Sequence, residues 1–175
     1  MPHIHDKIDF TVEVFIVYNN KVLLRKHDKY KMWLSVGGHI ELDEDPNQAA
    51  IREVKEEVGL NVKLSGVSKS FKDKNEYYEL IPPKFLNRHR INKDHEHITL
   101  VYFAASDTDK LSLSDKELSE ECKWFTKEEL ELYDIKESIK FYALQALEEL
   151  KNKLWIALNI YYLTYNYAKV FTLCS

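Results

Sequence analysis

The chain has 175 residues, which corresponds to one domain that is large enough to bury a core. Its 29 acidic residues outnumber 25 lysines and arginines, so it has no overall basic field with which to bind a nucleic-acid polymer. Two cysteines, Cys122 and Cys174, are too few for a disulfide framework or a cysteine-type zinc site. The first ten residues contain no apolar segment, so we expect no secretory signal. These features predict a globular cytoplasmic protein.

The N-terminal third indicates a strand pair followed by a glycine pair. Residues 8–18 are rich in Ile, Val, Phe and Thr, which favours a strand. The turn at 19–20 and the apolar residues 21–24 predict a hairpin. A short apolar run over 33–36 ends at Gly37-Gly38, which is half of the four glycines in the chain. We therefore expect the backbone to approach another group closely at 37–38.

The clearest element is a helix over 46–58. Asp45 suits the N-cap, Pro46 suits the first helical position, and Gly59 suits a left-handed C-cap. Apolar residues at helical spacing predict its buried stripe: Ala50, Ile51, Val54 and Val58.

The remaining elements have weaker patterns. Strands are expected at 60–71, 77–81, 97–105 and 122–125. A short helix is expected to begin at 126, and an amphipathic helix is expected over 135–150. The basic stretch 84–95 and the polar stretch 106–119 are expected to be irregular.

Three carboxylates cluster on the helix over 46–58. Glu53, Glu56 and Glu57 stand at i, i+3 and i+4, which places neighbouring Cβ atoms within about 6 Å of one another. Such a cluster is either a solvated acidic face or a site for a hard divalent cation that neutralises it. The spacing of these three residues alone favours the solvated face.

The residues around the cluster favour the cation site. The stretch GHIELDEDPNQAAIREVKEEVGL, residues 38–60, fits G-x5-E-x7-R-E-U-x-E-E-x-G-U at every specified position, where U is aliphatic. This stretch resembles the Nudix box. The resemblance extends over about residues 8–150, through the first strand pair, Trp33 and the run that begins at Trp124.

The resemblance implies a fold and a function. The fold would be α/β (α+β), a Nudix-type α/β/α sandwich with a mixed sheet, in which the box forms a loop–helix–loop. The function would be metal-dependent hydrolysis of a nucleoside diphosphate linked to another moiety, with Mg²⁺ or Mn²⁺ as cofactor. The substrate would be a small nucleotide-type molecule. The alternative is a Nudix-fold nucleotide sensor or interaction module without turnover.

The resemblance also assigns roles within the box. Glu53, Glu56 and Glu57 would hold the cation together with the backbone carbonyl near Gly37. Glu56 is our first choice for the catalytic base, which takes a proton from the attacking water, and Glu53 belongs to the same catalytic set. The other box residues would be structural: Gly38, Glu44, Arg52 and Gly59.

Other candidates for a base or a substrate contact lie outside the box. They are His95, His97, Glu120, Glu121, Arg88 and Arg90. His95 and His97 are two residues apart, so both would point to one face of a strand. As metal ligands they would need a third partner, which the sequence does not identify. The alternative for these residues is an ordinary polar strand entrance and a solvated basic loop.

The tail has a different composition from the rest of the chain. We expect a Nudix hydrolase domain over 1–153 and an apolar extension over 154–175. The extension is about as long as a membrane span, but Asn159, Asn166 and Lys169 interrupt it, which argues against membrane insertion. An extra buried helix or a self-association surface that produces a homodimer is the favoured interpretation.

Overall fold

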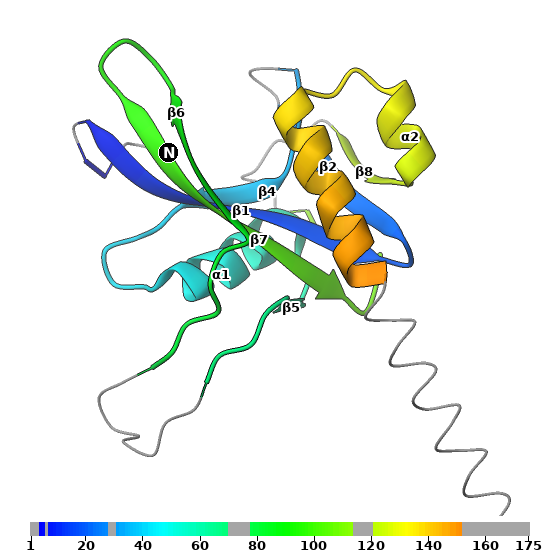
Figure 1. The fold of residues 1–175 in the computed structure, drawn as a ribbon, viewed down its shortest axis with the longest axis horizontal. Coiled ribbons are helices and arrows are strands. Elements are labelled where there is room, and N and C mark those ends of the chain that lie inside the picture. The colour runs from blue at the N-terminus through cyan, green and yellow to red at the C-terminus, as the bar shows by residue number, and fades with distance from the viewer. Residues whose placement is uncertain (1–3, 6, 28–30, 70–77, 114–120, 152–175) are drawn as a thin grey trace, which may run out of the picture.

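Strand β1 (Ile8–Tyr18) lies at the centre of a mixed sheet in the computed structural model (Figure 1). The structure describes residues 4–5, 7–27, 31–69, 78–113 and 121–151. Within them, the other strands are β2 (Lys21–Lys26), β3 (Trp33–Leu34), β4 (Val36–His39), β5 (Val62–Leu64), β6 (Phe85–Arg90), β7 (Glu96–Ser106) and β8 (Glu121–Phe125). The helices are α1 (Pro46–Val58), α2 (Lys127–Leu132) and an unlabelled helix over 137–151.

The strands run in the order β3-β2-β1-β7-β5. In addition, β4 pairs with β1, β6 pairs with β7, and β8 pairs with β2. The β1–β7 pair is parallel and the remaining pairs are antiparallel. This mixed sheet confirms the expected fold class.

The two faces of the sheet are covered by different helices, because neighbouring side chains of a strand point in opposite directions. In β1, Val14 and Ile16 pack with the apolar residues of α1. Phe15 and Val17 point to the other face and pack with the helix over 137–151. On this second face the apolar packing is limited to the second half of β1, because Asp9, Thr11 and Glu13 occupy the corresponding positions of its first half.

Helix α1 has the predicted bounds. The Asp45 side chain accepts hydrogen bonds from the backbone N–H groups of Asn47 and Gln48, and the Gln48 side chain completes a capping box. Gly59 ends the helix with φ of 71°, in the left-handed region. Ile51 is 46% exposed, so its assignment to the buried stripe was wrong: it lies on the solvent side of the helix.

Several other expectations need correction. Residues 85–90 form β6 and are not irregular. Within the described part of 60–71, which ends at residue 69, the strand is limited to Val62–Leu64, where β5 pairs with the end of β7. The described part of 77–81 contains no strand. The expected helix over 135–150 begins at 137.

The apolar extension lies outside the described residues, which end at 151. Among the residues that the structure describes, no helix has the length and apolar character of a membrane span.

Candidate functional site

The glycine pair and the carboxylates of α1 meet where β4 crosses β1. The backbone N–H of Gly37 donates a 3.0 Å hydrogen bond to Oε2 of Glu57. A Cβ at Gly37 would lie 2.1 Å from the carbonyl oxygen of Val12, and a Cβ at Gly38 would lie 2.3 Å from Oε1 of Glu53. Only glycine fits at position 37, and a Cβ at position 38 would displace the Glu53 carboxylate, which confirms the expected close approach of the backbone.

Arg52 connects the box residues to one another. Its Nε and Nη2 donate to the two carboxylate oxygens of Glu44 at 2.9 and 2.6 Å, and Nη2 also donates to the His39 carbonyl at 3.0 Å. Its Nη1 donates to Glu53 at 2.9 Å and to Glu56 at 3.1 Å. The planar guanidinium suits this bidentate arrangement. Arg52 lowers the pKa of Glu44 through these hydrogen bonds.

The three clustered carboxylates differ in exposure. Glu53 and Glu57 are 2% and 4% exposed, whereas the Glu56 side chain is 60% exposed. Glu57 forms an ion pair with Arg25 of β2 at 2.5 Å. The buried negative charges are therefore partly balanced by arginines from the same helix and from the sheet.

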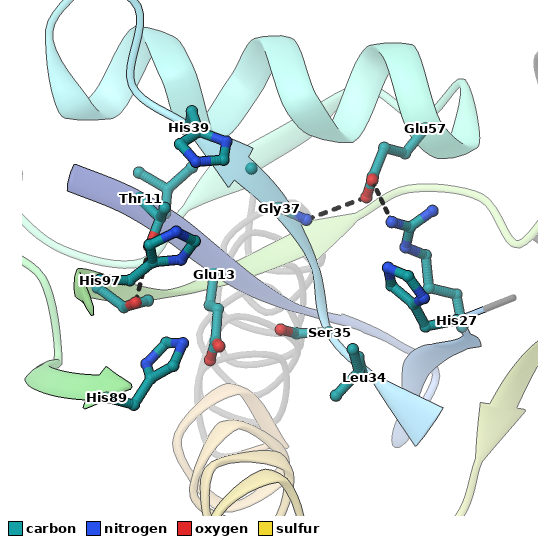
Figure 2. A pocket seen from close by; sticks show the side chains of 14 residues that line it. Thr11, Glu13, His27, Leu34, Ser35, Gly37, His39, Glu57, His89 and His97 are labelled. Carbon is teal, nitrogen blue, oxygen red and sulfur yellow. Dashed lines mark hydrogen bonds and ion pairs between the residues drawn. The ribbon is translucent and has the colours of Figure 1, made fainter. Parts of the chain in front are cut away.

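A pocket of about 280 Å³ opens beside this cluster. Figure 2 shows Glu57 on one side of Gly37, and His39 and His97 on the other. Glu13 also lines the pocket, and burial raises the pKa of its carboxyl to about 7, although nearby Lys136 opposes the shift.

Histidines gather at the far end of the pocket. The register pairs His97 of β7 with Asp9 of β1 and with His89 of β6. Burial and the neighbouring histidine rings lower the pKa of His97 to about 4, so its imidazole is neutral at pH 7. His95 precedes β7, and its Nε2 lies 3.2 Å from Oδ2 of Asp9. His95 and His97 therefore converge on Asp9, which supplies the third partner that the sequence did not identify.

The other candidates lie away from the carboxylates or outside the described residues. Arg88 and Arg90 have side chains 68% and 71% exposed, and each lies 3.7 Å from Glu96. Glu121 is half-exposed on β8 and lies 3.9 Å from Lys26. Neither Arg88, Arg90 nor Glu121 lines the pocket beside Glu57. Glu120 lies outside the described residues.

Sequence reasoning missed pocket residues that come from outside the box. Glu13 of β1 and Arg25 of β2 line the pocket, and Asp9 of β1 lies beside it because the register pairs Asp9 with His97. Alternation within β1 gives a partial signal, because the polar Asp9, Thr11 and Glu13 occupy every second position among apolar residues. His39 follows the glycine pair, where no function was predicted for it.

Comparison with known proteins defines the class of this fold and site. The family model described as the NUDIX domain matches residues 8–146. The chain is 39% identical to a NUDIX-family hydrolase from Clostridium perfringens, with a TM-score of 0.73, over 81% of this chain and 97% of that one. The chain therefore belongs to the Nudix family and is a Nudix hydrolase.

More distant structures share the fold. A MutT NUDIX hydrolase from Burkholderia pseudomallei is 18% identical with a TM-score of 0.59, over 82% of this chain and 98% of that one. A NUDIX hydrolase from Nitrosomonas europaea is 18% identical with a TM-score of 0.54, over 83% of this chain and 73% of that one. No curated protein matches the chain.

Proposed function

We propose that this Nudix hydrolase cleaves a nucleoside diphosphate linked to another moiety, by attack of water on phosphorus, with Mg²⁺ or Mn²⁺ as cofactor. The observation that carries the proposal is the packing of Glu53 and Glu57 against the glycine pair beside a pocket. The substrate would be a small nucleotide in the cytoplasm.

The residues present fit a hard divalent cation. Glu53, Glu56 and Glu57 would hold it together with the backbone carbonyl of Gly37, which is an all-oxygen donor set. Because Gly38 has no Cβ, the Glu53 carboxylate lies directly against the backbone at this position. When bound, the cation would neutralise the charge of the diphosphate and lower the pKa of a bound water.

The arginines would position the carboxylates. Arg52 fixes Glu53 and Glu56 on one side, and Arg25 fixes Glu57 on the other. Arg52 donates to Oε2 of Glu56, so Oε1 of this exposed side chain would take the proton from the attacking water. Glu56 therefore stays our first choice for the base.

The histidine end of the pocket would contact the substrate. His97 lines the pocket, so it stays the alternative base or a substrate contact, and buried His95 would act behind it. Arg88 and Arg90 would contact substrate phosphate only where the substrate extends beyond this pocket, since they line a neighbouring hollow that shares Glu13 and His89 with it.

The test is a panel of nucleoside triphosphates and nucleoside diphosphates linked to sugars or other groups, assayed with Mg²⁺ in water enriched in ¹⁸O. Mass spectrometry identifies the products and the phosphate that gains ¹⁸O. We expect cleavage of a phosphoric anhydride with ¹⁸O in one phosphate product. Incorporation of ¹⁸O into a product without phosphorus, or no turnover across the panel, would contradict the proposal.

A further inference from the structure

A group of side chains that could hold a metal ion lies beside the end of the pocket opposite Glu57, and one of its members, His97, lines the pocket. The group consists of Asp9, His95 and His97. One ligand atom of each residue lies within 4.8 Å of the ligand atoms of the other two. The parallel register of β1 and β7 creates this group, because it pairs Asp9 directly with His97 and places the His95 loop beside them.

The spacing of the donor atoms suits a metal ion. Oδ2 of Asp9 and Nε2 of His95 are 3.2 Å apart. Two ligands of a tetrahedral ion with bonds of about 2.0 Å are separated by roughly 3.3 Å, so one ion can contact both atoms without a change in backbone. A ring nitrogen of His97 lies within 4.8 Å of these two atoms, so a shift of its side chain towards them would complete the ligand set.

The surroundings of Asp9 orient its carboxylate. The backbone N–H of His5 donates to Oδ1 at 2.6 Å, and the backbone N–H of Ile4 donates to Oδ2 at 3.2 Å. Nε2 of His39 also lies 3.2 Å from Oδ2. Such outer contacts are typical of metal sites, where they fix the direction of the ligands. These contacts hold the fully buried Asp9 carboxylate in place.

We propose that Asp9, His95 and His97 bind a divalent transition-metal ion of the zinc type, separate from the cation of the Nudix box. Two imidazoles and one carboxylate suit such ions, whereas the all-oxygen set on α1 suits Mg²⁺. Asp9 and His95 are buried, and His97 lines the pocket beside Thr11 and Thr99. Because His97 lines the pocket, an ion held by these residues would border the pocket and would be able to take an anionic group of a bound ligand.

Cobalt binding tests this proposal without any measurement of turnover, so its outcome is independent of the proposed function. Untagged full-length chain is stripped of metal and titrated with Co²⁺ in excess Mg²⁺, with visible spectroscopy and equilibrium dialysis. We expect one Co²⁺ per chain, with ligand-field bands that Zn²⁺ removes and excess Mg²⁺ does not. Absence of stoichiometric binding would show that the group is a hydrogen-bonded cluster of protein side chains only.

Variants locate the ion. His95→Gln and His97→Gln should each weaken Co²⁺ binding at least about tenfold. His27→Gln removes another histidine of the same pocket, and Glu57→Gln removes a carboxylate of the box, so both should keep the spectrum and the affinity. If His95→Gln does not fold, His97→Gln decides, since His97 is only half-buried. Undiminished binding in His97→Gln, or loss of the spectrum in Glu57→Gln, would overturn the assignment.

Discussion

Arg52 and Glu44 form the contact that fixes the box loop to α1. Two hydrogen bonds join the guanidinium to the Glu44 carboxylate, and the same guanidinium reaches Glu53 and Glu56. Loss of the Glu44 carboxylate would remove two of the hydrogen bonds that orient the Arg52 guanidinium, which would weaken its hold on Glu53 and Glu56. The orientation of the proposed cation ligands therefore depends on a residue that we do not expect to touch the substrate.

Glu44→Gln should lower the free energy of unfolding at pH 7 by about 1–3 kcal/mol, because a charge-assisted pair is lost. The pKa of Glu44 is lower in the folded chain than in the unfolded chain, so the stabilisation is present at pH values above the unfolded pKa. This stabilisation is lost as pH falls through the pKa that Glu44 has in the folded chain. Urea unfolding at several pH values should therefore show that the difference in free energy of unfolding between wild type and variant becomes smaller as pH falls.

Glu41→Gln is the matched control for this measurement, since it removes an exposed carboxylate of the same loop that Arg52 does not contact in the described structure. It should leave the free energy of unfolding within about 0.5 kcal/mol of the wild-type value. If the difference in free energy of unfolding between wild type and Glu44→Gln stays constant across the pH range, the charged Glu44 carboxylate is not stabilised by Arg52.

Glu53→Gln and Glu57→Gln should each lower kcat at least about 10²-fold, which is about 2.7 kcal/mol of transition-state stabilisation. Both residues are proposed cation ligands, and glutamine keeps their shape but removes the charge. Steady-state kinetics in saturating Mg²⁺ gives the value, and circular dichroism checks the fold. Glu137→Gln, at an exposed position of the helix over 137–151, should keep the wild-type rate. Near-normal rates in both box variants would exclude these carboxylates as ligands.

At the scale of elements, the sequence predicts most reliably what depends on local contacts. Helix α1 has the expected bounds because Asp45, Pro46 and Gly59 determine its ends through neighbouring residues. Strand β6 was not predicted, because its inward positions include Asn87 and His89 and do not form an apolar alternation. These polar side chains are present because this end of the sheet borders the pockets and not the core.

The candidate site was also predicted only in part, and the predicted residues are those that lie close together in sequence. The box motif predicted the cluster of Glu53, Glu56 and Glu57 from their spacing in one helix. Asp9 meets His97 only through pairing between β1 and β7, which are far apart in sequence, and a single sequence does not specify that register. Arg25 meets Glu57 through the packing of the sheet against α1. The difference in burial between Glu56 and its two neighbours likewise depends on the packing of α1 against β4.

Gly59→Val should destabilise the chain by more than about 1 kcal/mol, because a β-branched residue resists the positive φ at the end of α1. The added Cβ would also lie 2.6 Å from the Ser112 side chain and its carbonyl oxygen. Urea unfolding of variant and wild type measures the effect. An unchanged midpoint would mean that α1 ends in another way in solution.

At the scale of the whole molecule, the core residues that the structure describes extend to Leu150. The helix over 137–151 completes one side of the sheet through Ile139, Ala143 and Leu147. The proposed site lies among β1, β2, β4 and α1, and all of its residues precede Gly59 or belong to β6 and β7. We therefore propose that 1–153 is the catalytic domain and that 154–175 serves association.

Removal of 154–175 should leave kcat and KM unchanged and should alter solubility or association state. The reason is the apolar run near 155–163, which favours burial against the domain or against a second copy. Size-exclusion chromatography with light scattering and steady-state kinetics on both forms decide this. A truncated chain that folds but loses turnover would show that the extension builds part of the site.

The central claim is that the carboxylates of α1 work through a divalent cation, and metal dependence of turnover tests it most directly. The full chain is stripped of metal by exhaustive chelation, assayed with its best substrate, and assayed again after Mg²⁺ or Mn²⁺ is added back. We expect turnover to disappear on chelation and to return with Mg²⁺ or Mn²⁺ in the wild type, but not in Glu57→Gln. Turnover that survives exhaustive chelation would contradict it.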